Sequence, residues 1–161
     1  MRIGFLSLVM AATLFVAAPA AQAQGGMRTG PDTSTLRDPD LEKDSLHNLE
    51  VARNYFKLKK AYVASLKRCE EIIAGNPNFA KIEEVLLIAG QSSLWLSENK
   101  GKQRPEQYVT FDNGEKRTLT PEQFRDMGRE YLSKLIKDYP EGSYAKQARE
   151  ELRTRALETK Q

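Results

Sequence analysis

The stretches AYVASLKRCEEIIAGNP (Ala61–Pro77) and FRDMGREYLSKLIKDYP (Phe124–Pro140) share one spacing of small and apolar residues. In each, a small residue lies twelve positions before the proline, and apolar residues lie eight and five positions before it. These residues are Ser65, Cys69 and Ile72 in the first stretch and Gly128, Leu132 and Leu135 in the second. The match continues beyond each proline, where Ile82 and Val85 correspond to Ala145 and Ala148. It predicts a helix-turn-helix unit that occurs twice, with a hairpin inserted in the second copy.

Helical spacing extends on both sides of these stretches. Apolar residues recur mostly at steps of three and four within 39–60, 61–76, 79–98, 121–139 and 143–158, which predicts about five helices. The expected inner stripe of the first helix is Leu46, Leu49, Val51, Ala52, Tyr55, Phe56 and Leu58, and that of the second is Tyr62, Ser65, Leu66, Cys69, Ile72 and Ile73. Because only a couple of residues join these two helices, we expect them to pack antiparallel as a helical hairpin.

Local signals mark several helix ends and one helix interior. We expect Gly75 to adopt a left-handed cap conformation and Asn78 to cap the third helix. Gly90 lies in the middle of that helix, where glycine costs about 1 kcal/mol relative to alanine, so we expect a close helix contact there. Thr120 is followed directly by Pro121, and Gln123 lies three positions after Thr120, which predicts a capped start for the fourth helix.

The segment 100–119 departs from helical spacing. Tyr108–Phe111 is aromatic and β-branched, and Asn113-Gly114 is a turn pair that favours positive φ at both positions. The pattern predicts a β-hairpin near 108–119, with a long irregular loop as the alternative. Because an isolated hairpin is marginally stable in water, we expect it to lie against the helices.

The N-terminal residues resemble an export signal rather than part of a fold. Residues 1–23 contain Arg2, an apolar run and an A-x-A motif at Ala21–Ala23, which predicts a cleaved signal peptide and a periplasmic protein. An uncleaved N-terminal anchor is the alternative. Residues 24–38 contain almost no large apolar side chain, so we expect a flexible leader before a helical domain at 39–158. We expect no integral membrane segment in the mature chain.

The composition excludes several classes of protein. The chain has 161 residues, 25 Lys plus Arg, 22 Asp plus Glu, and only one His and one Cys. These counts argue against an internal disulfide, a structural zinc site and a catalytic triad. The formal net charge of +3 is too small to indicate a nucleic-acid partner by itself. We therefore predict no catalytic residue, no metal and no cofactor. We expect Cys69 to be buried in a helix, with a reactive thiol as the alternative.

Other polar and aromatic groups have structural interpretations. We expect Glu70-Glu71 and Glu83-Glu84 to lie on solvated helix surfaces, because adjacent helical residues point about 100° apart and do not converge. The single His47 has no partner ligand, which favours a surface or packing role. The basic segment Lys100–Arg104 is interpreted as a loop, with an anionic surface as a further option. The aromatic residues expected in the core rather than on nucleic-acid bases are Tyr55, Phe56, Tyr62, Trp95 and Tyr131.

The segments His47–Ile73 and Asp138–Leu152 resemble the tetratricopeptide-repeat family. The second contains a Tyr-Pro-x-x-Ser-x-Ala-x-x-Ala spacing, and the two matched prolines lie 63 positions apart, close to one repeat of about 34 plus an insert of about 29. The residue pattern of these segments is similar to that of the BamD-like branch, whose members are lipoproteins of the outer-membrane barrel assembly machinery. Other envelope repeat proteins, such as periplasmic partners of the Tol-Pal system, share it.

Two departures separate this chain from that branch. It lacks a lipidated cysteine after the signal, since Cys69 is its only cysteine, and it has roughly two repeats and a closing helix where the family has about five. The resemblance implies an all-α fold of antiparallel helical hairpins. It also implies a non-catalytic scaffold that binds an envelope protein or peptide, in outer-membrane protein assembly or another envelope complex. A repeat unit cannot bury its face alone, so a homo-oligomer is an alternative way to cover the open ends.

A second hypothesis places function in the insert. A small exported enzyme or accessory subunit could have a site at 100–119, using Tyr108, Asp112 and Glu115. This hypothesis lacks an evident base and nucleophile. Deletion of Lys100–Leu119 distinguishes the two hypotheses, since loss of a partner without loss of folding favours an interaction insert, whereas a turnover abolished by Asp112→Asn favours the enzyme.

Overall fold

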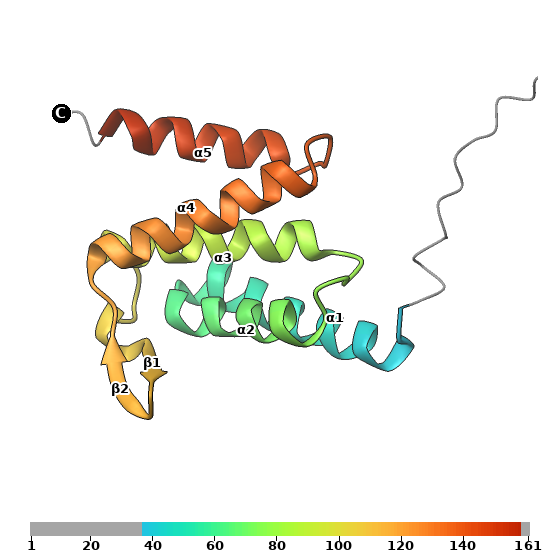
Figure 1. The fold of residues 1–161 in the computed structure, drawn as a ribbon, viewed down its shortest axis with the longest axis horizontal. Helices are drawn as coiled ribbons and strands as arrows, with labels where there is room; N and C mark the ends of the chain where they lie inside the picture. Colours follow the sequence, from blue (N-terminus) through green and yellow to red (C-terminus); the bar gives the residue numbers. More distant parts are fainter. Residues whose placement is uncertain (1–36, 159–161) are drawn as a thin grey trace, which may run out of the picture. The chain divides into compact units, whose positions relative to one another are not determined.

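Five α-helices and a two-stranded antiparallel sheet make up residues 37–158, the part of the chain that the computed structural model describes (Figure 1). The helices are α1 (Pro39–Arg53), α2 (Tyr62–Gly75), α3 (Ile82–Ser97), α4 (Pro121–Asp138) and α5 (Ala145–Glu158). A π-helical turn, η2 (Asn54–Lys59), continues α1, and a short 3-10 turn, η3 (Pro105–Gln107), precedes strands β1 (Val109–Asp112) and β2 (Glu115–Thr118). The mostly helical architecture with a small β-hairpin agrees with the sequence prediction. The predicted signal peptide and most of the predicted leader lie outside the described residues.

Helix α3 occupies the middle of the helical unit, between α2 and α4 (Figure 1). All of its residues are buried except Glu83, Trp95 and Ser97, which are half-buried. Such all-round burial follows from its run of apolar and small side chains, because a helix that is apolar on every side must be covered on every side. Hairpin α1–α2 covers one side of α3, and α4 covers the other, with α5 packed on α4.

The matched positions of the two repeat copies are all buried. Ser65, Cys69 and Leu132 are fully inaccessible to solvent, Gly128 is buried, and the other matched residues are at most 6% exposed. Equivalent burial at equivalent spacing is the expected result if both copies use one helix face for packing. The inserted β-hairpin follows α3 and precedes α4 in the sequence.

Gly90 and Gly128 form the close helix contact that the sequence predicts. A Cβ atom added to Gly128 would lie 2.9 Å from the carbonyl oxygen of Gly90, and one added to Gly90 would lie 2.7 Å from the Leu132 side chain. Both distances are shorter than real Cβ contacts allow. The two backbones therefore touch where α3 crosses α4, which explains why a mid-helix glycine is tolerated despite its cost.

Several predicted helix ends are wrong. Gly75 lies in the last helical turn without positive φ, whereas Lys60, Asn99 and Gly101 adopt the left-handed conformation. Helix α3 begins at Ile82 without a side-chain cap, because an irregular turn separates it from α2, and the Asn78 carbonyl instead accepts a hydrogen bond from Arg37 Nε at 3.0 Å. Arg37 and Asp38, placed in the leader by composition, belong to the helical unit, since Asp38 caps α1 by accepting from the Asp40 and Leu41 amides.

Other local predictions are confirmed with one revision each. Thr120 and Gln123 form the predicted capping box. The β-hairpin has positive φ at both Asn113 and Gly114. Only its base lies against the helices, through the buried Tyr108, whereas β2 is exposed throughout. In the first helix the buried stripe is Ser45, Leu49, Ala52 and Phe56, whereas Leu46 and Leu58 are exposed. Leu58 lies two positions after the buried Phe56, so helical spacing itself places it on the opposite side of the helix from this stripe.

Most of the predicted core aromatics pack as expected. Phe56, Tyr62 and Trp95 form one cluster at the end where α1–η2 and α2 are connected, with the Phe56 and Trp95 rings stacked at 4.7 Å between centroids. Tyr131 packs against the core. Tyr55 is half-buried and lies outside this cluster, with the Lys59 ammonium 4.9 Å from its ring centroid. Cys69 is fully buried as predicted, and burial raises the pKa of its thiol far above the ordinary value, which leaves it unreactive.

Candidate functional site: a polar groove between α1, α3 and α5

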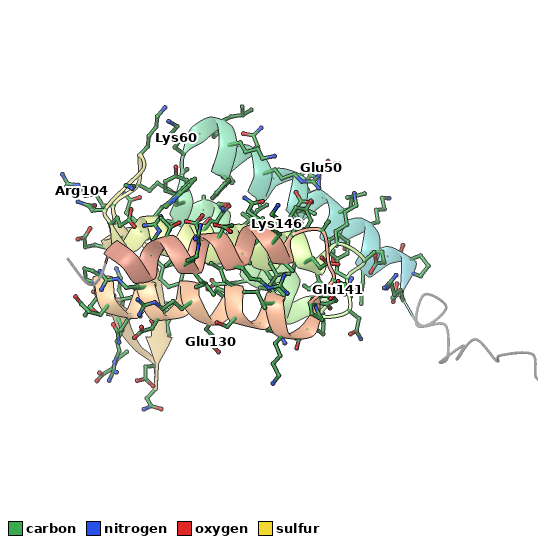
Figure 2. The ribbon with its side chains drawn as sticks, turned by 90° about the horizontal axis from the view of Figure 1, so that it is seen from above. Glu50, Lys60, Arg104, Glu130, Glu141 and Lys146 are labelled. Carbon is green, nitrogen blue, oxygen red and sulfur yellow. The ribbon has the colours of Figure 1, made fainter. Side chains whose placement is uncertain are left out.

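Arg53, Glu84 and Tyr144 meet in a hollow between three helices. Arg53 lies at the end of α1, Glu84 in the first turn of α3, and Tyr144 immediately before α5. Arg53 donates through Nε to Glu84 Oε1 at 2.6 Å and through Nη2 to Oε2 at 2.5 Å, and the Tyr144 hydroxyl also bonds to Glu84. This two-pronged pair fixes both side chains. In Figure 2, Glu50 of α1 and Lys146 of α5 mark the helices on the two sides of the hollow.

The hollow has a volume of about 340 Å³ and mostly polar walls. Its lining consists of Arg53, Ala80, Lys81, Glu83, Glu84, Ser143 and Tyr144. The hydrogen bond and charge of Arg53 lower the pKa of Glu84 and, conversely, Glu84 raises the pKa of Arg53, so both groups are ionised at neutral pH. Glu83 differs from Glu84, because its buried Oε2 has no hydrogen-bond partner among the described residues.

A polar stripe continues from this hollow along α3. Glu84, Gln91 and the C-cap residue Glu98 recur at steps of seven along the mostly apolar α3, and each contacts a side chain of α5 or its start. Gln91 Nε2 donates to Glu151 at 3.5 Å, and Glu98 forms an ion pair with Arg155. This seven-residue step is a signal that sequence reasoning missed, because the neighbouring acid pair was interpreted as solvated.

The prediction of solvated acid pairs is wrong for Glu70 and Glu84. Glu84 is 9% exposed, and Glu70 lies beneath the insert, where it accepts from the Tyr108 hydroxyl at 2.6 Å and the Tyr131 hydroxyl at 3.3 Å. Burial raises the pKa of Glu70, and the two hydroxyl bonds partly oppose that rise. Burial and the carboxylate also raise the pKa of both tyrosines well above the ordinary value, so these hydroxyls remain protonated donors.

The three residues of the enzyme hypothesis do not converge. Tyr108 is buried against Phe124 at the base of the hairpin, whereas Asp112 and Glu115 face each other across the exposed turn and Asp112 pairs with Arg117 at 2.9 Å. Four strand positions separate Tyr108 from Asp112, about 13 Å along a strand. Tyr108 instead attaches the insert to α2.

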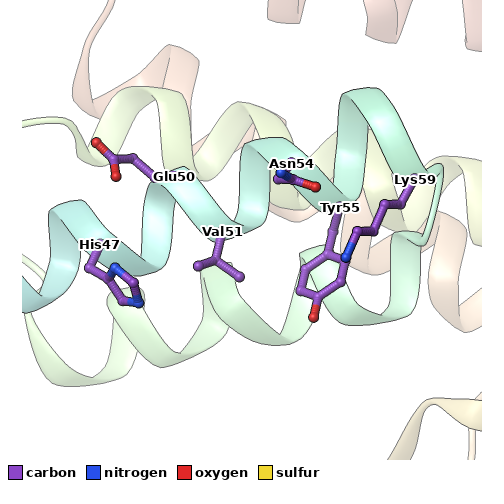
Figure 3. A pocket seen from close by; sticks show the side chains of 6 residues that line it. All are labelled: His47, Glu50, Val51, Asn54, Tyr55 and Lys59. Atoms are coloured by element: carbon purple, nitrogen blue, oxygen red, sulfur yellow. The ribbon is translucent and has the colours of Figure 1, made fainter.

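A second hollow of about 300 Å³ lies along α1 and η2 (Figure 3). It is lined by His47, Glu50, Val51, Asn54, Tyr55 and Lys59. His47 is exposed there, and within residues 37–158 no group of three or more His, Cys, Asp or Glu side chains could hold a metal ion. Since all six lining residues come from one continuous helix, this hollow lacks the facing walls that fix a bound segment.

Comparison of the chain with protein-family models, curated proteins and solved structures finds no match. None of the helices within residues 37–158 is both long and apolar enough to span a bilayer. The geometry of the groove is therefore the basis for a functional proposal.

Proposed function

We propose that this chain is an exported, non-catalytic helical-repeat scaffold of the tetratricopeptide type that binds a segment of another cell-envelope protein. The main support is the polar groove, in which α1, α3 and α5 contribute to one hollow around the Arg53–Glu84 pair. Repeat scaffolds bind extended or helical peptides on such multi-helix surfaces. The burial of all matched repeat positions supports the tetratricopeptide type.

The groove supplies specific recognition groups. The half-buried Glu83 lines the hollow, where its carboxylate can accept an N–H group from a bound peptide, and the exposed Lys81 can pair with an acidic side chain. Because Arg53 and Glu84 already hold each other, they form a rigid floor that costs little ordering entropy on binding. Glu83 and Lys81 are therefore the residues proposed to select the partner, in outer-membrane protein assembly or in another envelope complex.

Site-specific photocrosslinking in cells tests this proposal. A photoreactive residue at Lys81 should capture an envelope protein, whereas the same residue at Lys137, exposed on α4, should not. Glu83→Ala should weaken capture at Lys81 without lowering the amount of folded protein. Capture of the same proteins from both positions, or of cytosolic proteins alone, would contradict a groove-specific envelope partner.

A further inference from the structure

Two basic segments far apart in the sequence meet at one end of the helical unit. Lys59 ends η2, Lys60 follows it, and Lys100, Lys102 and Arg104 follow α3; we call these five residues the basic corner. The Lys102 amide donates to the Lys60 carbonyl at 2.9 Å, so the two segments touch through their backbones. Lys60 and Arg104 lie at the same end in Figure 2, away from Glu141.

Specific backbone contacts hold the two segments of the basic corner together. A Cβ on Gly101, which has φ +98°, would lie 2.7 Å from the Lys60 carbonyl oxygen, so only glycine allows this approach. Next to it, Gln103 Oε1 accepts from the Ala64 amide at 2.9 Å and thereby caps α2, whose N-cap residue has no capping side chain. The loop that displays three of the cations is thus held on the start of α2.

All five cationic side chains of the basic corner are exposed. Two acidic residues lie in the same loop region, Glu98 and Glu106. Glu98 is already shared between Lys100 and Arg155, and Glu106 is exposed. The corner therefore keeps a net positive charge, although the whole chain has a formal charge of only +3.

An exposed apolar side chain directly precedes two of these cations in the sequence. Leu58 is 75% exposed and directly precedes Lys59 and Lys60, and the half-buried Tyr55 lies one turn earlier. A nucleic-acid backbone gives an exposed leucine little apolar contact, whereas the boundary between lipid headgroups and acyl chains buries an apolar side chain directly beside bound cations. Four of the five cations are lysines, whose flexible point charges suit a diffuse anionic surface better than the two-pronged contacts of arginine.

We propose that the basic corner, with Leu58 at its edge, is a peripheral membrane-docking surface for bilayers that contain anionic phospholipid. The lysines and Arg104 bind the headgroup charge, and Leu58 enters the interfacial layer. This proposal concerns a surface separate from the groove and does not depend on the groove partner.

Vesicle co-sedimentation tests the proposal with the chain from Gln24 to Gln161, which contains the whole described unit. The probe is vesicles of phosphatidylglycerol mixed with phosphatidylcholine, compared with phosphatidylcholine alone. We expect binding to the anionic vesicles only, with its loss at about 1 M salt, where screening shortens the reach of exposed charges to about 3 Å. Lys59→Gln, Lys102→Gln and Arg104→Gln together should weaken binding by about 100-fold, since each basic residue near an anionic surface contributes about fivefold.

A matched control has the same change in charge elsewhere. Lys43, Lys137 and Lys146 are exposed on α1, α4 and α5, and their replacement by Gln should leave vesicle binding within about threefold of the unaltered chain. Leu58→Ser, which keeps the charge, should weaken binding by about fivefold through lost apolar burial. Circular dichroism should report the same helix content for all variants.

Three results would overturn the membrane proposal. One is equal binding to neutral and anionic vesicles, and another is equal loss of binding in the two triple variants. The third is failure to sediment with anionic vesicles while a fluorescent oligonucleotide binds through the same three residues, which would assign the corner to nucleic acid instead.

Discussion

The two helical hairpins α1–α2 and α3–α4 achieve close packing in different ways. In α1–α2, the fully buried Ser65 faces α1 and its hydroxyl donates to the Ala52 carbonyl at 3.0 Å. In α3–α4, the equivalent Gly128 faces Gly90 with backbone against backbone. One repeat pattern thus permits a hydrogen-bonded contact in the first hairpin and a side-chain-free contact in the second. The first should be sensitive to loss of a polar group, and the second to added volume.

Added volume at Gly128 should have the largest effect. Gly128→Leu should lower the free energy of unfolding by about 3 kcal/mol, because the new side chain must displace the α3 backbone as well as Leu94. Gly128→Ala, which gains about 1 kcal/mol of helix propensity, should cost about 1–2 kcal/mol. Urea denaturation measures both.

The control for this comparison is Gly75, which also lies in a helix but has open space around it. Gly75→Ala and Gly75→Leu should be neutral or stabilising by up to about 1 kcal/mol. If Gly75 and Gly128 variants lose equal stability, close backbone contact is not the reason for glycine at position 128.

Removal of the link between the hairpins should have the second-largest effect. Glu84→Gln leaves Arg53 without its charged partner in a partly buried site, where the side chains are 12% and 30% exposed, and should cost about 2 kcal/mol. The matched variant Glu71→Gln breaks the exposed Arg68–Glu71 pair and should change stability by less than about 0.5 kcal/mol. Equal effects in chemical denaturation would argue that the Arg53–Glu84 pair contributes no more than a surface pair.

Loss of the hydroxyl in the first hairpin should have a smaller effect. Ser65→Ala removes one buried hydrogen bond to Ala52 and should cost about 1 kcal/mol. Ser133→Ala, on the exposed face of α4, provides the control and should be neutral or slightly stabilising. A Ser65→Gly variant that recovers no stability would indicate that volume is not limiting in this hairpin.

The pH dependence of stability should separate the two buried carboxylates, with the smallest effect. The pKa of Glu70 is raised above 4.5, so the folded state binds more protons than the unfolded state between that pH and the folded pKa, and stability from this group falls as pH rises through that window. The pKa of Glu84 is lowered, so its contribution is present above about pH 4.5 and is lost as pH falls through the folded pKa.

Denaturation curves from pH 3.5 to 7.5, a range set by these ordinary carboxyl values, measure this difference. Glu70→Gln, whose amide oxygen can still accept from Tyr108, should reduce the decline toward neutral pH. Glu84→Gln should reduce the decline toward acid. If Glu70→Gln instead reduced the loss of stability toward acid pH, the tyrosine hydrogen bonds would outweigh burial in setting the pKa of Glu70.

Signals between near neighbours predicted much of the fold. The Thr120 capping box, the Asn113-Gly114 turn and the buried stripe around Ser65 and Cys69 depend on residues a few positions apart, so a single sequence contains them. Predictions from the sequence were wrong where the structure of a residue depends on residues far away in the chain. Asn78 does not cap α3, and its carbonyl instead accepts a hydrogen bond from Arg37, which lies 41 positions away.

The candidate sites depended on contacts across the chain. Glu70 and Glu71 are neighbours of one residue type, yet Glu70 is covered by Tyr108 and Tyr131, which lie 38 and 61 positions away, and Glu71 remains exposed. Arg53 and Glu84 are 31 positions apart. No periodicity in either segment reveals which carboxylate will meet a partner, because that depends on how the helices cross.

The sequence by itself determined where the helices and the hairpin form and which small residues allow close packing, since these follow from backbone preference and apolar period. The tertiary structure alone decided which charges are paired in the groove and which gather at the basic corner. The reason is physical: the balance between desolvation and pairing of a charge depends on the groups that face it, and those groups come from other helices.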